Sequence, residues 1–219
     1  MNDRGGLLDK LNRKIGRYAI SNLMFYIVGG MAVVFVANLV LGAMQNVNLY
    51  QLLLFDKAAI FSGEVWRAVT FVLLPPDSGI IFIFFALYFY WLIGSALENH
   101  WGSFRFNAFY FCGVLCTIVS GLITGYATNA YVNLSLFFAF ALLYPDFQIM
   151  LFFVLPVKIK YIAILDAVYF LIALIFNTWP GRIALLIALG NVALFFGGDF
   201  LATLRQWDRR RRFRRDAKR

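Results

Sequence analysis

The sequence predicts an all-α integral membrane protein built as a six-helix bundle. Hydrophobic residues make up 62% of its 219 residues and charged residues only 14%, and the mean hydropathy is +0.76. Apolar stretches close to the roughly 20 residues that cross a bilayer as a helix recur along the chain. The basic residues gather at its two ends. This composition excludes a water-soluble globular domain, whose core could not cover so much apolar surface.

Six transmembrane spans follow from the apolar stretches, with bounds that are accurate to a few residues. In chain order they are residues 18–43, 79–97, 106–125, a shorter span at 131–144, 159–176 and 183–204. Together they form one membrane domain over residues 18–205. Residues 1–17 precede it as a cytoplasmic amphipathic segment, and residues 206–219 follow it as a basic cytoplasmic tail. The long segment between the first two spans, residues 44–78, is expected on the outer side of the membrane.

The distribution of Lys and Arg orients these spans. Of the 20 basic residues, five lie in residues 1–17 and nine in residues 205–219. Basic segments stay on the cytoplasmic side, so both termini are expected inside and the number of spans must be even. Arg105, Lys158 and Lys160 also fall on the inner side in this arrangement. We expect a multi-pass protein of a prokaryotic inner membrane, with no removable signal peptide.

The two terminal segments are interpreted as membrane anchors. Leu7, Leu8, Leu11 and Ile15 share one side of a short helix, which suggests that it lies in the inner interface. The tail "RQWDRRRRFRRDAKR" could contact nucleic acid, but a polybasic run directly after a span is the usual topology anchor and binds anionic lipid headgroups. Membrane lipids are therefore the expected partners, and nucleic acid is not.

Small residues recur at helical spacing on the third span. Gly113 and Gly121 belong to this face, which predicts close helix packing. Cys112 and Cys116 lie one turn apart on the same span and could form a metal or redox pair, but two thiols without further ligands fall short of a structural zinc set. No cofactor and no metal site are expected. Asn133 begins a glycosylation pattern, "NLS", which is unusable inside a span.

The first loop carries "FSGEVWRAVTFVLLPPDSG", with Glu64, Trp66 and Arg67 in apolar surroundings. A guanidinium there needs several acceptors, which the backbone carbonyl groups of a folded loop can supply. We therefore expect Arg67 to be buried and bonded to backbone oxygens.

Several of these stretches, taken in order, resemble the rhomboid intramembrane proteases and their relatives. The pair Trp66-Arg67 is similar to the loop-one motif of the family. "LIGSALENHWGSFRFNAFYF", residues 92–111, resembles the end of the family's second helix, and "FALLYPDFQIMLFFVLPVKIKY", residues 140–161, resembles the passage from its fourth helix to its fifth. The resemblance covers most of residues 18–205 and implies a six-helix rhomboid-like bundle with a long membrane-associated first loop.

The chemistry of the family is absent at the matching positions. The family's serine nucleophile, at the start of the fourth helix, falls on Ala130. Its histidine base, in a His-x-x-Gly-x-x-x-Gly pattern on the sixth helix, falls on Asn191 when the second glycine of that pattern is laid on Gly198. Sliding the match to Gly197 places Gly190 at the histidine position instead. The oxyanion donors of the second helix fall on Phe82 and Ala86. Gly197 and Gly198 are expected to serve helix packing.

Other residues do not restore a catalytic pair. His100 is the only histidine and lies on the predicted inner side, whereas the chemistry of the family lies near the outer surface. Ser135 is a candidate for a displaced nucleophile, about 7.5 Å farther along the helix than Ala130. Lys158 and Lys160 lie at the wrong end for a Ser-Lys pair.

The resemblance therefore implies a catalytically inactive rhomboid-like protein, a pseudoprotease that binds the transmembrane segments of client proteins. Two alternatives stay open at this point: an atypical rhomboid serine protease, and a membrane protein that handles lipids or small solutes.

Overall fold

The computed structural model describes residues 14, 16–45, 47–77, 79–125, 127–151, 155–179, 181–183, 185–186 and 190. Within these residues, four helical segments are long and apolar enough to cross a membrane, namely Gly16–Gln45, Ile80–Trp101, Ser103–Thr124 and Ile159–Phe176. A shorter apolar helix, Ala130–Leu143, lies among them. The described part of the chain is thus a mostly helical protein with a membrane-embedded composition.

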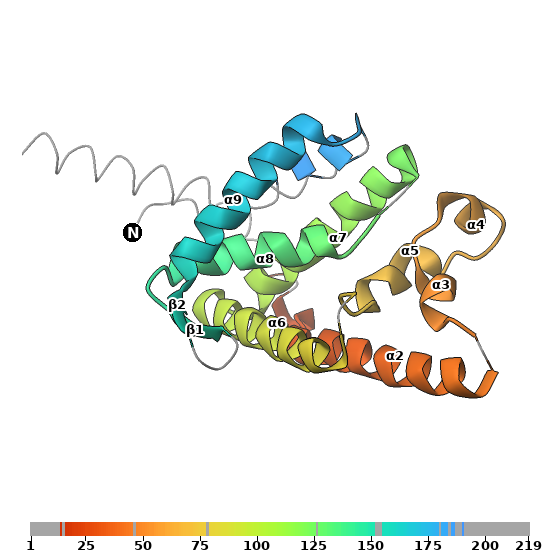
Figure 1. Cartoon of the computed structure of the whole chain (residues 1–219), viewed down its shortest axis with the longest axis horizontal. Coiled ribbons are helices and arrows are strands. Elements are labelled where there is room, and N and C mark those ends of the chain that lie inside the picture. The colour runs from red at the N-terminus through yellow and green to blue at the C-terminus, as the bar shows by residue number, and fades with distance from the viewer. Residues whose placement is uncertain are drawn as a thin grey trace, which may run out of the picture.

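The elements follow one another as helices with one small hairpin (Figure 1). In chain order they are η1 (Gly16–Tyr18), α2 (Leu23–Gln45), α3 (Leu49–Leu53), α4 (Lys57–Phe61), α5 (Arg67–Thr70), η2 (Phe71–Leu73), α6 (Ile80–Trp101), α7 (Ser103–Thr124), α8 (Ala130–Leu143), β1 (Gln148–Leu151), β2 (Leu155–Lys158) and α9 (Ile159–Phe176). Helices α2, α6, α7, α8 and α9 correspond to the first five predicted spans. The sixth, at 183–204, lies almost wholly outside the described residues.

A buried carboxylate holds α2 against the junction of α6 and α7. Asn22 adopts a left-handed conformation with φ 55°, so α2 begins at Leu23 rather than at Tyr18. The Asn22 N–H donates to Glu98 Oε1 over 2.7 Å, and the hydroxyl of Ser103 donates to the same oxygen over 2.6 Å. Because Glu98 is only 7% exposed, these donors offset part of the cost of burying its charge.

Helix α8 lies at the centre of the bundle and packs against α6, α7 and α9. Its buried face includes Val132, Leu136 and Phe140, each no more than 2% exposed. After α7 ends, the chain runs back toward the bundle before α8 begins (Figure 1). The short helix is therefore enclosed by longer neighbours.

Glycines allow two of the close approaches in this core. A Cβ added at Gly94 on α6 would lie 2.3 Å from a side-chain carbon of Met24 on α2. One added at Gly121 on α7 would lie 2.6 Å from the ring of Phe55 in the first loop. Gly113 is buried on the same helix. Gly121 lies against the first loop and the connection to α8, whereas the sequence predicts that it packs against another long helix.

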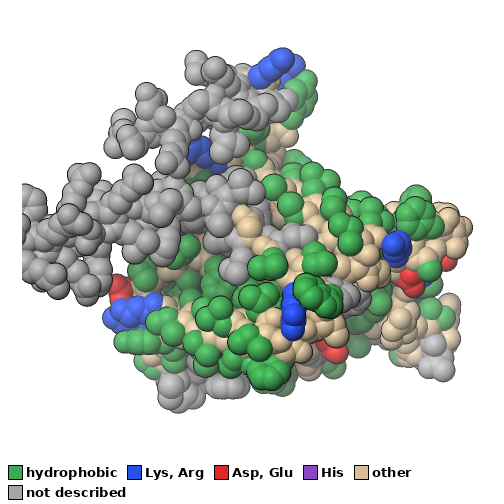
Figure 2. All heavy atoms as spheres, turned by 90° about the horizontal axis from the view of Figure 1, so that it is seen from above, with side chains coloured by type: hydrophobic (Ala, Val, Ile, Leu, Met, Phe, Trp, Pro, Cys, Tyr) green, Lys and Arg blue, Asp and Glu red, His purple; other side chains and the backbone are tan. Residues whose placement is uncertain are grey.

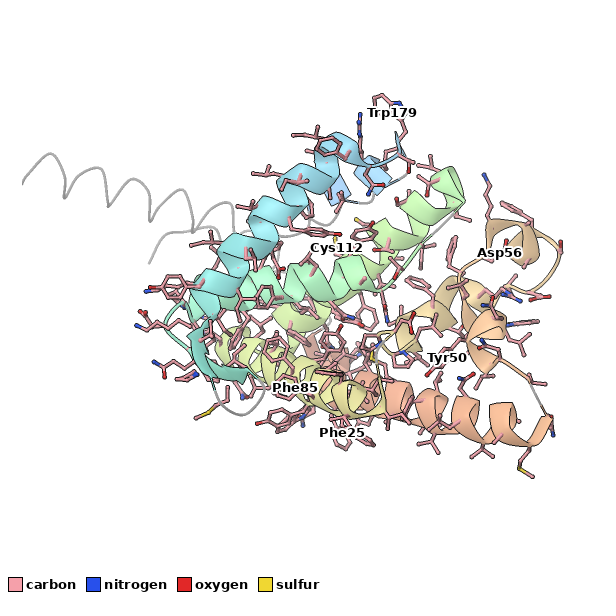
Figure 3. The ribbon with its side chains drawn as sticks, viewed as in Figure 1. Phe25, Tyr50, Asp56, Phe85, Cys112 and Trp179 are labelled. Carbon is pink, nitrogen blue, oxygen red and sulfur yellow. The ribbon has the colours of Figure 1, made fainter. Side chains whose placement is uncertain are left out.

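The first loop is folded into short helices. Helices α3, α4 and α5 gather at the end of the molecule opposite β1 and β2 (Figure 1). Two of these helices begin with side-chain caps: Asn48 accepts from the N–H of Tyr50, and Asp56 accepts from those of Ala58 and Ala59. Burial and the nearby Asp77 carboxylate raise the pKa of the Tyr50 hydroxyl. Figure 3 marks Tyr50 and Asp56 in this part of the chain.

A two-stranded antiparallel hairpin, β1–β2, connects α8 to α9 and is absent from the all-α prediction. Its register runs from Gln148 opposite Lys158 to Leu151 opposite Leu155. Asp146, just before β1, pairs with Lys158 at 3.2 Å and with Lys160 at 2.9 Å. Hydrogen bonds from these two ammonium groups hold the pKa of Asp146 below its usual value. The hairpin thus brings one negative and two positive charges together at one end of the bundle.

Hydrophobic side chains cover much of the surface of the described residues (Figure 2). On α9, for example, Leu165 is 69% exposed and Phe176 is 82% exposed. Apolar surface of this extent is typical of a protein that faces lipid.

Candidate functional site

A cavity of about 400 Å³ lies between α6, α8 and α9. We call it the first cavity. It is lined by Phe85, Ala86, Phe89, Tyr90, Ala130, Asn133, Leu134, Phe137, Ile149, Ile162 and Asp166. Figure 3 marks Phe85 on α6 at the side of the bundle. Most of this lining is apolar or aromatic, which suits a side chain of a transmembrane helix or part of a lipid chain better than a polar solute.

Three polar side chains interrupt the apolar lining. Asn133, on α8, is only 5% exposed, and its side chain hydrogen-bonds with the Tyr90 side chain of α6. The Oδ1 atom of Asn133 accepts no hydrogen bond from the described residues. Asp166 stands on α9, seven residues after the helix begins. The first cavity is therefore a mainly apolar space with acceptor oxygens on two of its walls.

A second cavity, of about 430 Å³, lies beside the first between α8, α9 and the residues after α9. Its lining includes Tyr169, Ala173, Asn177 and Leu185. Ala130, Leu134 and Asp166 line both cavities, so these three residues form the boundary between them. The start of α8 and the middle of α9 thus meet at one place.

The structure brings together two of the four positions that the resemblance assigns to the catalytic groups of the rhomboid family. Ala130, at the nucleophile position, and Ala86, at one oxyanion-donor position, line the same cavity from α8 and α6. Phe82, at the other donor position, is 55% exposed and lies outside the lining of both cavities. Asn191, Gly197 and Gly198 lie outside the described residues.

The residues considered for displaced catalysis, Ser135 and His100, line neither cavity. Ser135 is 1% exposed and donates its hydroxyl to the Val132 carbonyl oxygen over 2.7 Å, and it lines neither cavity. His100 lies near the end of α6, where its ring is 6.0 Å from that of Tyr144. It is about 21 Å along the helix axis from Ala86. Neither residue faces the first cavity.

Arg67 is bound within the first loop as expected. Its side chain is 11% exposed and forms an ion pair with Glu64. Its guanidinium donates to the carbonyl oxygens of Gln51 over 2.6 Å and Leu54 over 3.3 Å. Trp66 stays 50% exposed and donates from its indole to the Leu52 carbonyl oxygen over 3.3 Å. The pair Trp66-Arg67 therefore fastens α5 to α3, and Arg67 is confirmed as a residue that bonds backbone oxygens.

The cysteines of α7 form no metal site with the other described residues. Cys112 and Cys116 are free and half-buried, and no group of three or more His, Cys, Asp or Glu side chains within the described ranges could hold a metal ion. Figure 3 marks Cys112.

Two residues of the first cavity are missing from the candidates that the sequence supplies. Asp166 could have been found, because a carboxylate in the middle of a predicted span is costly unless it has a partner. For Asn133, the sequence shows only a glycosylation pattern that is unusable inside a span. Its position between two helices needs the packing of α6 against α8, which a single sequence does not show.

No family model matches the chain, and no curated protein matches it.

Proposed function

We propose that this protein is a rhomboid-like membrane protein without the catalytic pair, which binds transmembrane segments of client proteins at the mouth of the first cavity. The single observation that carries the proposal is the shared lining of that cavity by Ala86 and Ala130. These are positions on two different helices that the resemblance alone assigns to one site.

The packing of the helices supports this assignment. If α6 and α8 are the second and fourth helices of a rhomboid-like bundle, the start of α8 must lie beside the outer half of α6. Ala86 is six residues from the beginning of α6, and Ala130 is the first residue of α8. Both line the first cavity, so α6 and α8 lie beside each other at these two residues, as a rhomboid-like arrangement of the two helices requires.

The side chains at these positions favour binding over catalysis. Alanine at positions 86 and 130 carries neither a nucleophile nor a hydrogen-bond donor. The polar groups that line the first cavity are a tyrosine hydroxyl, an amide and a carboxylate. No histidine or lysine, which could act as a base, is among the described lining residues. An apolar groove with a few polar groups is suited to hold a helix in the membrane.

The weak packing of α9 supports a groove at the side of the bundle. Within the described part of the chain, α9 packs against α8 and β2, and no extended contact joins it to α6. Its buried residues are Ile159 and Phe170. A client helix can therefore approach between α6 and α9, both of which line the first cavity.

Site-specific photo-crosslinking in native membranes tests the proposal. A benzophenone amino acid in place of Phe89, which lines the first cavity, is expected to capture the membrane-spanning segments of other proteins. The matched control is Phe84, which lies on the same helix, is 64% exposed and lies outside the cavity lining. Mass spectrometry of the captured peptides identifies the clients.

The two sites give different outcomes under each alternative. Client segments captured at position 89 and not at position 84 support the proposal. Equal capture at both positions, or capture of lipid alone at position 89, contradicts it, and the second result favours a lipid-handling protein.

A further inference from the structure

The carboxylate of Asp166 lies in the middle of α9, where a charged group is costly to place inside a membrane. It stands about 10.5 Å along the axis from Ile159 and about 15 Å from Phe176, so a membrane that this helix crosses places it near mid-depth. A carboxylate at that depth is stabilised by a cation or by strong donors. The ion pairs among the described residues use Glu64 and Asp146, not Asp166.

Asn133 supplies a second acceptor on the facing wall. Its side chain is more than nine-tenths buried, and its Oδ1 atom lacks a hydrogen-bond partner among the described residues. A buried acceptor without a partner costs about 1 to 3 kcal/mol, so a ligand that donates to it recovers that free energy. Asn133 is about 4.5 Å along the axis from the start of α8.

These acceptors and the apolar lining together define the chemistry of a ligand. The body of the ligand must be apolar, because phenylalanine, leucine and isoleucine side chains line most of the first cavity. Its polar group must donate hydrogen bonds, because Asp166 and the Asn133 Oδ1 atom accept them. A positively charged donor also balances the negative charge of Asp166, whereas a neutral amide or hydroxyl donor does not.

We propose that the first cavity selects client transmembrane helices that carry a Lys or Arg side chain near the middle of the span. The basic group pairs with Asp166 and donates to Asn133, while the rest of the client helix lies along α6 and α9. This inference rests on the proposed function and adds to it the class of client. A cavity of about 400 Å³ admits a side chain of the client rather than its whole helix.

Peptide binding to the full-length protein in phospholipid vesicles tests the inference. The vesicles contain phosphatidylcholine and phosphatidylglycerol, whose headgroups carry no amine N–H. Fluorescent peptides with a Leu-Ala span of about 23 residues differ only at the central position, which is Lys, Leu or Glu. Energy transfer from donor-labelled protein reports binding, and the Lys peptide is expected to bind about tenfold more tightly than the Leu peptide.

Variants locate the preference. Asp166→Asn keeps the shape of the side chain and is expected to abolish most of the preference for Lys, whereas Asp166→Glu retains it. Asn133→Leu is expected to reduce the preference severalfold. Asp146→Asn is the matched control, because Asp146 pairs with Lys158 and Lys160 at the hairpin and lies outside both cavities. Circular dichroism and size-exclusion chromatography confirm that each variant is folded.

The outcomes separate this inference from the proposed function. Equal binding of the Lys and Leu peptides, or an unchanged preference in Asp166→Asn, overturns the inference and leaves client binding in place. If none of the peptides binds and position 89 captures no client, client binding itself is wrong. A benzophenone at position 162 that crosslinks chiefly to residues 187–204 of the same chain identifies the occupant as this protein's own segment, and that result also overturns the inference.

Discussion

Asn129 donates from its side-chain Nδ2 to the carbonyl oxygen of Leu74 over 2.7 Å, which ties the residue before α8 to the end of the first loop. The same nitrogen donates to the Val72 carbonyl oxygen over 3.1 Å. Asn129 is 8% exposed, so these oxygens are shielded from water on that side. One amide thus joins the segment that precedes α6 to the segment that precedes α8, and both helices line the first cavity.

Replacing Asn129 should therefore destabilise the protein through the loop. Asn129→Leu leaves two backbone carbonyl groups without their donor, and we expect a loss of about 1 to 3 kcal/mol in the free energy of unfolding. Thermal unfolding in detergent measures the loss, and hydrogen exchange should rise at residues 71–77. Asn48→Ala is the control: it removes an exposed cap over 3.1 Å, whose backbone donor water can satisfy. An equal loss of stability in both variants would show that the hydrogen bonds of Asn129 stabilise the protein no more than an exposed helix cap does.

Arg67 should be required for the folding of the first loop. Arg67→Ala removes hydrogen bonds to the carbonyl oxygens of Gln51 and Leu54 together with the ion pair to Glu64. Charge-assisted bonds contribute roughly 1.5 to 3 kcal/mol each, so the thermal midpoint of the purified protein should fall clearly. Arg67→Lys should recover only part of the loss, because an ammonium group lacks the planar fork of donors.

The control for Arg67 is Lys57, a basic residue of the same loop. Lys57→Ala should change the thermal midpoint little. An unchanged midpoint in Arg67→Ala would show that the hydrogen bonds of the guanidinium do not stabilise the protein.

Gly121 should not tolerate a side chain. In Gly121→Ala the new Cβ would lie 2.6 Å from ring carbons of Phe55 and 2.7 Å from the Cβ of Ala127, so one of these groups must move. Overpacking of this kind costs about 1 to 3 kcal/mol, which thermal unfolding detects. Gly29→Ala, at a helical glycine with nothing within 4 Å of the added Cβ, should be tolerated. If the clash with Phe55 is the cause, the double variant with Phe55→Leu should be more stable than Gly121→Ala alone.

Both termini are expected in the cytoplasm. The prediction depends on the five basic residues of segment 1–17 and the nine of segment 205–219. Alkaline phosphatase and fluorescent-protein fusions at residues 1 and 219 report the side of each end. An outward C-terminus would remove the six-span proposal and, with it, the rhomboid-like arrangement.

The protein is expected to cleave no peptide bond in the membrane. Ala130 offers no nucleophile and Asn191 no base, while Phe82 and Ala86 offer no side-chain oxyanion donor. Restoring Ala130→Ser and Asn191→His should still give no activity, since each missing donor costs roughly a hundredfold or more in rate. Tyr131 would also crowd the new serine, because the family has a small glycine there.

A fluorophosphonate probe and a panel of transmembrane substrates measure this inactivity. We expect neither labelling nor cleavage by the native protein. Labelling that maps to Ser135, or cleavage lost in Ser135→Ala, would restore the atypical protease as the better interpretation.

The helices were predictable because their apolar length alone specifies them. Helix α8 begins at Ala130, one residue from the predicted start, and α9 has the predicted bounds Ile159–Phe176. The prediction of α2 was less accurate, because the turn at Asn22 depends on Glu98, which is 76 residues away in the chain. Hydropathy contains no information about such a contact.

The site was harder to predict because it is made of contacts between helices. The resemblance assigned Ala86 and Ala130 to one place, and the structure lines one cavity with both. It does not do so for Phe82, which is 55% exposed and lines neither cavity. The acceptors Asn133 and Asp166 were missed as a pair, since they come from different helices and match no sequence motif. The hairpin was missed because its residues, "QIML" and "LPVK", lack the alternation of polar and apolar residues that predicts an exposed strand.

The shortness of α8 has a consequence for biogenesis. Its 14 residues extend about 21 Å, less than the roughly 30 Å of a hydrocarbon core, and they include Asn133 and Ser135. Such a segment is a poor substrate for independent insertion by the translocon, because its transfer from water into the bilayer gains too little free energy. Helices α6 and α7 leave the ribosome first and provide part of its binding surface, and α9 provides the rest. We therefore expect insertion of this helix to depend on the synthesis of the next one, so the order in which the helices assemble depends on this short segment.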